Sequence, residues 1–158
     1  MDFTRLIARL ADLAREGDGK AVAALFTEDG LYEDGFHGAF RGREAIAHMI
    51  DELFLGASED LDWQFFEPVE ANNLGYARYL FSYTLTLPEA KGKRVMFEGM
   101  SRFVLKDGKI RHYWEIFDRG VALSQLDFAP ERVAKILKKE ADRLRSTPEA
   151  RPHLVRET

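Results

Sequence analysis

The sequence has no cysteine, and it has no apolar run near the roughly 20 residues that a membrane helix needs. The missing cysteine excludes a disulfide scaffold, a thiolate zinc site and a thiol nucleophile. Charged residues interrupt the apolar N-terminal stretch, so it does not have the pattern of a signal peptide. We therefore expect a cytoplasmic protein without a membrane span, of a length that suits one domain.

An excess of basic residues is also missing. The chain has 23 Lys and Arg against 27 Asp and Glu, a net charge of −4, which argues against nucleic acid as the main partner. Neither a phosphate-binding glycine loop nor a hydrolase nucleophile elbow occurs. Residues 129–158 carry +3 and the rest of the chain −7, which indicates an appended helix.

Aromatic residues, by contrast, are plentiful: 12 Phe, 5 Tyr and 2 Trp among 158 residues. In the first third of the chain the apolar residues recur with the i, i+3, i+4, i+7 spacing of half-buried helices. After Gly56 they alternate with polar residues, which is the period of a strand. Asp107-Gly108 predicts a tight hairpin turn, and Pro130 predicts the first residue of a final helix.

These patterns predict an α+β domain over residues 1–128, a C-terminal helix over 129–146 and a loose tail over 147–158. The curved antiparallel sheet is expected to wrap on the N-terminal helices and form a cone-shaped α+β barrel. The expected helices cover residues 3–16, 20–26, 43–54 and 130–146; the expected strands cover 31–34, 36–40, 61–69, 76–87, 94–105 and 110–118, with a turn at 28–30.

Four segments carry a resemblance to a known family: Arg15–Asp18, Leu25–Asp34, Gly42–Ile46 and Asp107–Ile110. With them the chain resembles the nuclear transport factor 2-like superfamily, which includes ketosteroid isomerases and SnoaL-like polyketide cyclases. The resemblance covers roughly residues 3–126. It implies the cone-shaped fold but leaves the reaction open, because this fold hosts enzymes, binders and oligomerisation modules.

The resemblance nominates two catalytic carboxylates. Ketosteroid isomerases place a general base in a Glu-Asp pair after the first strand, which implies Asp34 here. SnoaL-like cyclases place a carboxylate on the last strand, which implies Glu115. The isomerase oxyanion donors fall at Arg9 and Ser101, and the loss of both donors argues against a true steroid isomerase.

A carboxylate walled by aromatic rings is desolvated, so its pKa and its basicity rise. His37 suits a proton shuttle at the cavity mouth. No histidine pair has metal-ligand spacing, so neither a metal nor another cofactor is expected. Strand parity and the resemblance predict ten ligand-binding residues: Tyr32, His37, Trp63, Phe65, Tyr79, Phe81, Tyr83, Ser101, Tyr113 and Phe117.

Each candidate also has a structural interpretation. Asp34 is equally suited to capping the turn at Gly35, Glu115 to pairing with an arginine, and His37 to a solvated loop. The sequence therefore supports two hypotheses. One is a cofactor-free isomerase or cyclase that uses a pocket carboxylate as general base on an apolar, carbonyl-bearing substrate. The other is a non-catalytic ligand-binding or dimeric accessory module; an epoxide-opening hydrolase is a third option.

The opposite sheet face is expected to carry Leu80, Trp114 and Ile116, which are too apolar to leave in water. The resemblance also implies dimerisation there. A homodimer through this outer sheet face is therefore predicted, with a small apolar molecule as the ligand and neither nucleic acid nor a membrane as partner.

Overall fold

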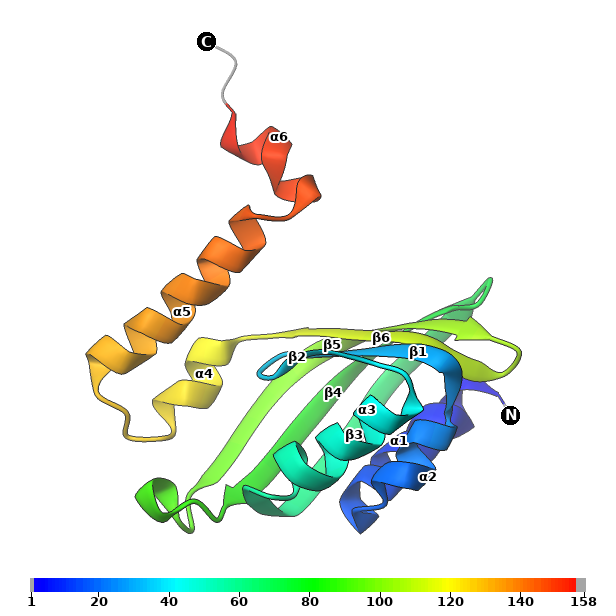
Figure 1. The fold of residues 1–158 in the computed structure, drawn as a ribbon, viewed down its shortest axis with the longest axis horizontal. Coiled ribbons are helices and arrows are strands. Elements are labelled where there is room, and N and C mark those ends of the chain that lie inside the picture. The colour runs from blue at the N-terminus through cyan, green and yellow to red at the C-terminus, as the bar shows by residue number, and fades with distance from the viewer. Residues whose placement is uncertain (1, 156–158) are drawn as a thin grey trace. The chain divides into compact units, whose positions relative to one another are not determined.

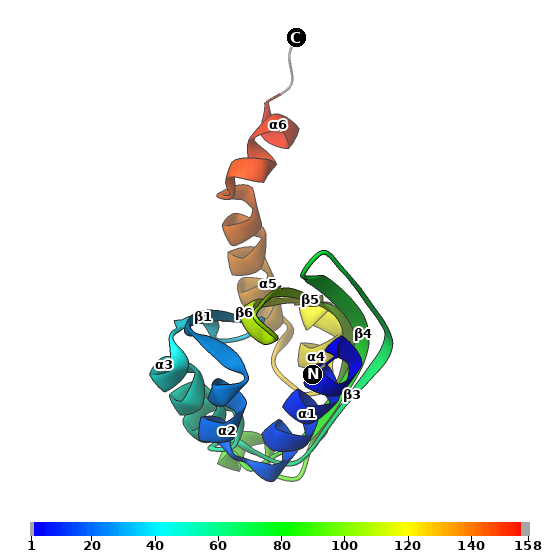
Figure 2. The same cartoon turned by 90° about the vertical axis from the view of Figure 1, so that its right-hand side faces the viewer.

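The computed structural model describes residues 2–155 and divides them into two compact units, the first ending at Asp118 and the second beginning at Arg119. The first unit is mixed α+β, with helices on one side of a curved, unclosed six-stranded sheet (Figure 1). The sheet curves around α1 and α2, as Figure 2 shows. The predicted α+β cone architecture is confirmed.

Helices and short strands come first. They are α1 (Phe3–Glu16), α2 (Gly19–Ala24), β1 (Phe26–Asp34), β2 (Gly38–Arg41), α3 (Arg43–His48) and the π-helical segment η1 (Met49–Phe54). Asp2 caps α1 by accepting a hydrogen bond from the Arg5 amide, and Gly17 ends it in the left-handed conformation at φ 77°. The apolar stripe of α1, from Phe3 to Ala14, is buried as its spacing predicts.

The long strands follow: β3 (Ser58–Ala71), β4 (Leu74–Leu85), the short 3-10 turn η2 (Pro88–Ala90), β5 (Arg94–Lys106) and β6 (Lys109–Phe117). The strand order is β2-β1-β6-β5-β4-β3. Every neighbouring pair is antiparallel except β1 and β6, which are parallel, with Tyr32 opposite Tyr113 and Glu33 opposite Trp114. The predicted hairpin turn is present, with Asp107 and Gly108 at φ 51° and 74°.

Two local predictions were wrong because the strands contain bulges. Residues 28–30 do not form a separate turn but lie within β1, where its pairing with β6 shifts between Phe26 and Leu31. Val69 has the same parity as Trp63 and Phe65 in the predicted strand 61–69, which would turn it inward, but it is 63% exposed. A bulge between Phe66 and Val69, with Glu67 at φ 53°, reverses the alternation there.

The second unit is helical and comprises α4 (Arg119–Ser124), α5 (Pro130–Arg145), the 3-10 turn η3 (Pro148–Ala150) and α6 (Arg151–Leu154). Pro130 opens α5 as predicted. The sequence patterns did not predict α4, which is joined to α5 by an ion pair of 3.4 Å between Arg119 and Glu140. The tail predicted to be loose contains η3 and α6, and its residues 156–158 lie outside the described residues.

Candidate functional site

The site forms where β1 ends beside the C-terminal end of β6. Because these strands run parallel, Asp34 and Gly35 follow directly after the pair Glu33–Trp114 and reach the level of Glu115. The Gly35 amide donates a hydrogen bond of 3.1 Å to Glu115 Oε1. A Cβ at position 35 would lie 2.1 Å from the Phe117 ring, so only glycine allows this close approach.

Glu115 ends a chain of hydrogen bonds across β5 and β6. The Tyr113 hydroxyl donates to Glu115 Oε2 over 2.8 Å, and the Ser101 and Tyr113 hydroxyl oxygens lie 3.0 Å apart. Because tyrosine has one hydroxyl proton and Glu115 takes it, Ser101 is the donor to Tyr113. Ser101 and Tyr113 are both fully buried, and burial raises the pKa of the Tyr113 hydroxyl, which keeps it a donor.

The carboxyl group of Glu115 titrates far from its ordinary range. Its pKa is raised to about 7, with burial as the largest cause and the negative charge of Asp34 as the second. The donors Tyr113, the Gly35 amide and the Tyr79 hydroxyl favour the ionised form and act in the opposite direction. Glu115 therefore exchanges protons near neutral pH, as a general acid or base must.

Asp34 has a different environment. Its side chain is only 2% exposed, and its Oδ1 atom accepts hydrogen bonds from the amides of Phe36 and His37, at 2.9 and 2.6 Å. His37 Nδ1 lies 2.8 Å from the same oxygen, and this hydrogen bond raises the pKa of the His37 ring. Asp34 thus caps the turn after β1 and also holds His37, whose side chain is 35% exposed.

The aromatic candidates form one connected cluster next to the carboxyl groups. Tyr32 stacks on Tyr113 with a centroid distance of 4.4 Å, and Phe81 joins Trp63 to Tyr83. Burial and, to a lesser degree, the charge of Asp34 raise the pKa of Tyr83 to about 12. Phe117 packs on Phe97 at 4.4 Å.

Within this cluster the rings mostly pack on one another. Tyr32, Tyr79, Phe81 and Tyr113 are each at most 4% exposed, and only Trp63 and Phe65 also line a pocket between α1 and β3. Sequence reasoning missed Phe36, which packs on Phe97 and Phe117, and the Gly35 amide. Phe36 could have been proposed because it lies two residues after Asp34. The Gly35 amide could not, because a backbone donor is not indicated by any residue type.

Strand parity is confirmed for β6: Tyr113 and Phe117 are buried on the inner face, and His112 pairs with Glu33 on the other face at 2.6 Å. No arginine pairs with Asp34 or Glu115 among the residues that the structure describes.

Within residues 2–155, no three His, Asp or Glu side chains come close enough together to hold a metal ion. In that same range no helix is long and apolar enough to cross a membrane.

Comparison with known protein families and structures identifies relatives of this chain. The sequence profile of the SnoaL-like domain matches residues 7–113, two residues short of Glu115. The chain belongs to the SnoaL-like domain family. A comparison with curated protein sequences gives no match.

Solved structures of the same fold are distant in sequence. TsrD from Streptomyces laurentii is 20% identical, with a TM-score of 0.68 over 80% of this chain and 98% of that one. A putative polyketide cyclase from Xanthomonas campestris is 21% identical, with a TM-score of 0.65 over 78% and 96%. An LEH-like epoxide hydrolase from M. tuberculosis is 17% identical, with a TM-score of 0.64 over 77% and 86%. At sequence identities this low, the comparison shows that the SnoaL-like chain shares its fold with all three proteins and shows nothing about a shared reaction.

The raised pKa of Glu115 predicts a pH-dependent stability. Its pKa rises from 4.5 in the unfolded chain to about 7 in the fold, so its contribution is complete below pH 4.5 and is lost as the pH rises through 7. The loss is about 3 kcal/mol at most. Glu115→Gln, which does not titrate, should therefore gain stability relative to the parent between pH 5 and pH 8.5 in urea unfolding.

Glu59→Gln, at an exposed glutamate, is the control. A stability difference between Glu115→Gln and the parent that stays constant over this range contradicts the assignment.

The position of Tyr79 gives a second prediction. A Cβ at Gly99 would lie 2.6 Å from the Tyr79 hydroxyl and 2.5 Å from the Ile116 carbonyl, so Gly99→Ala displaces this donor. Because Tyr79 lowers the pKa of Glu115, both Gly99→Ala and Tyr79→Phe should raise that pKa above about 7. Carbon-13 NMR of the glutamate carboxyl groups measures it. Tyr76→Phe, at a 38% exposed tyrosine of the same strand, should leave the titration as it is.

Proposed function

We propose that this protein is a cofactor-independent isomerase or cyclase that removes a proton next to a carbonyl group of a small apolar molecule. The observation that carries the proposal is the Glu115 carboxyl group, with its pKa near 7, held by Tyr113 and the Gly35 amide. The similarity to structures named as polyketide cyclases supports the reaction class.

In this proposal Glu115 is the general base. The ionised carboxylate takes the α-proton of the substrate, and the protonated form returns a proton to the product. The Tyr113 hydroxyl holds the carboxylate, Tyr79 lowers its pKa, and Ser101 orients Tyr113. Asp34 raises the pKa of Glu115 by its charge and holds His37, whose partly exposed ring carries protons between the site and water.

The aromatic cluster supplies the apolar wall. Tyr32, Phe81, Tyr83 and Phe117 keep water from the carboxyl groups, which is why a carboxylate there is basic enough to attack a carbon acid. Trp63 and Phe65 extend the wall toward α1. An apolar molecule with a carbonyl oxygen suits this environment.

A non-catalytic binding module is the second candidate, and one observation favours it. The Tyr113 hydroxyl and the Gly35 amide both donate to Glu115, so neither is directed at a substrate oxyanion. Arg9, at the first isomerase donor position, lies on the exposed side of α1 and pairs with Glu16 at 3.8 Å. The epoxide-opening option requires an arginine between two carboxylates, and the partners described above for Asp34 and Glu115 include none.

A proton-exchange experiment tests the enzyme. In deuterated buffer the protein should accelerate exchange of the α-protons of 2-tetralone or 2-indanone, followed by proton NMR. The rate should rise with pH through an apparent pKa of about 7, because only ionised Glu115 is a base. Glu115→Gln should lose at least a hundredfold. Thr27→Ser, remote from the site, is the matched control. Equal rates in Glu115→Gln and the parent would favour the binding module.

We further propose that the SnoaL-like domain forms a homodimer through the outer sheet face. Met96, Met100 and Ile116 on this face are 51%, 43% and 56% exposed, and Leu80 and Trp114 beside them are half-buried. An apolar surface of this kind on a sheet is typical of an interface.

Charges placed in that surface test the dimer. Sedimentation should give about twice the 18.1 kDa chain mass for the parent and the single-chain mass for Met100→Glu or Ile116→Lys. A buried charge without a partner costs several kcal/mol, enough to dissociate a weak dimer. Leu87→Glu, at a 43% exposed residue just after β4, should leave the mass unchanged. A parent that sediments as a single chain at all concentrations would exclude this interface.

A further inference from the structure

The turn between β1 and β2 carries an aromatic ring at the edge of the Glu115 site. This turn spans residues 35–37, between the paired residues Asp34 and Gly38. Phe36 lies in its middle and is 38% exposed, one residue after the amide that binds Glu115. A single exposed apolar ring is ordinary on a protein surface. This one stands at the boundary between a carboxylate site and water.

The backbone of the turn is held in place. The Gly35 amide donates to Glu115 Oε1 at 3.1 Å. The amides of Phe36 and His37 donate to Asp34 Oδ1 at 2.9 and 2.6 Å. The two carboxyl groups of the site thus hold all three amides of the turn. The Phe36 side chain keeps its own torsions, so its ring can change rotamer while the backbone stays where it is.

Phe36 belongs to a layer of three rings next to Glu115. Its ring centroid lies 4.9 Å from that of Phe117 and 5.8 Å from that of Phe97, and Phe97 and Phe117 are 4.4 Å apart. Phe117 follows Glu115 by two residues in β6, so both point to the same face of the sheet. Phe97 and Phe117 are 6% and 8% exposed, so Phe36 is the member of this ring layer that meets water.

On its other side Glu115 faces a closed interior. Tyr113 precedes it by two residues in β6 and packs on Tyr32 and Phe103, at centroid distances of 4.4 and 5.1 Å. These three aromatic residues are each 0% exposed. Glu115 itself is half-buried, so part of its surface borders a space that a small molecule can enter. With the interior side sealed by Tyr113, the ring layer is the side from which Glu115 is approached.

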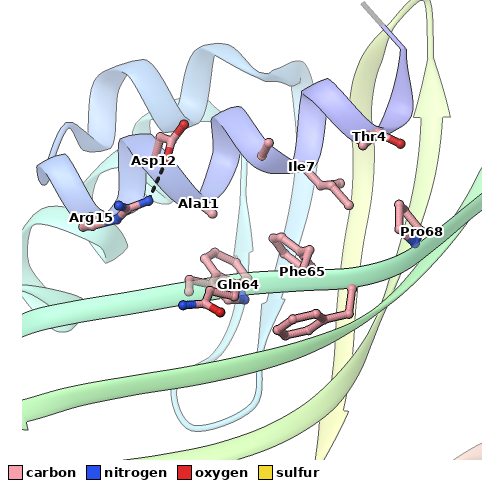
Figure 3. A pocket seen from close by; sticks show the side chains of 11 residues that line it. Thr4, Ile7, Ala11, Asp12, Arg15, Gln64, Phe65 and Pro68 are labelled. Carbon is pink, nitrogen blue, oxygen red and sulfur yellow. Dashed lines mark hydrogen bonds and ion pairs between the residues drawn. The ribbon is translucent and has the colours of Figure 1, made fainter.

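The pocket between α1 and β3 belongs to another part of the first unit. Figure 3 shows this pocket, of about 350 Å³, with Ile7 and Ala11 of α1 on one side and Phe65 of β3 on the other. Its lining includes neither Glu115 nor any residue of the ring layer. A molecule in this pocket therefore does not contact the carboxyl group.

We propose that Phe36 is the gate and a specificity-determining residue of the Glu115 site. Its ring turns toward water to admit a ketone, and in the closed position it packs with Phe97 and Phe117 against the apolar end of that molecule. The preferred substrates are compact aryl ketones. A longer apolar group would hold the Phe36 ring away from its two neighbours and lose that aromatic packing. This assignment rests on the site proposed at Glu115, but not on proton transfer there.

Two ketones of different length test the gate. Acetophenone and 4-acetylbiphenyl carry the same acetyl group and differ by one phenyl ring at the far end. With both ketones in one sample of the full chain, exchange of the acetyl protons in deuterated buffer, followed by proton NMR, gives the ratio of their kcat/KM values. Phe36→Ala removes the ring and should shift this ratio about tenfold toward 4-acetylbiphenyl. Phe36→Trp enlarges the ring and should shift it toward acetophenone.

Two further variants control the comparison. Tyr76 is also a 38% exposed aromatic residue, but it lies opposite Arg102 and so on the sheet face away from Glu115. Tyr76→Ala should therefore keep the ratio of the parent. Phe36→Leu fills part of the space of the ring and should give a ratio between those of Phe36→Ala and the parent. It also keeps the test decisive if Phe36→Ala does not fold.

A binding measurement separates the gate from the enzyme. Competition dialysis with the same two ketones gives the ratio of their affinities without turnover, and Phe36→Ala should shift it in the same direction. This shift in a protein that does not exchange acetyl protons would leave the gate standing and exclude the enzyme. Exchange by the parent, with unchanged ratios in the folded Phe36 variants, would overturn the gate and leave the enzyme standing. A parent that binds neither ketone would overturn both.

Discussion

The parallel pairing of β1 with β6 is the constraint on which the site depends. All other strand pairs in the sheet are antiparallel, and this pair alone joins the first strand of the chain to the last. It brings the turn after Asp34 to the level of Glu115, across 80 residues of sequence, where the Gly35 amide reaches the carboxylate. Without this register, Glu115 would have neither the Gly35 amide, which lowers its pKa, nor the nearby charge of Asp34, which raises it.

The two carboxyl groups of the site have different environments. Asp34 is held by two backbone amides and an imidazole, all on one oxygen. Glu115 accepts hydrogen bonds from the Tyr113 hydroxyl and the Gly35 amide in an apolar surrounding, and its pKa is raised to about 7, mainly by burial. Two carboxyl groups close together with unequal environments are a common basis for separate acid and base roles.

Much of the fold follows from local patterns. The period of two in β4 to β6 predicts which residues face inward, and Tyr79, Phe81 and Tyr113 are buried accordingly. The α1 stripe and the Asp107-Gly108 turn are equally local. Local patterns fail where the pairing is irregular: residues 28–30 lie within a register shift of β1, and at Val69 one extra residue in β3 reverses the side-chain direction.

The candidate site was only partly accessible from sequence. Asp34 and Glu115 were nominated by resemblance, and their proximity depends on a pairing that no local pattern encodes. The Gly35 amide and the Gly99–Tyr79 contact arise from tertiary packing. The pocket between α1 and β3 depends on the spacing between a helix and a strand that are far apart in sequence, and Ala8 and Ala11 are among the residues that line it.

The bulges of β3 affect whether this edge strand can pair with a strand of another molecule. β3 is an outermost strand, 14 residues long, and such an edge offers its unpaired amides and carbonyls to any passing strand. Register shifts occur near both of its ends, Asp60 and Glu67 take positive φ angles, and Pro68 lacks an amide hydrogen. These breaks leave no long straight row of hydrogen-bonding groups, so the edge is protected against strand-to-strand aggregation.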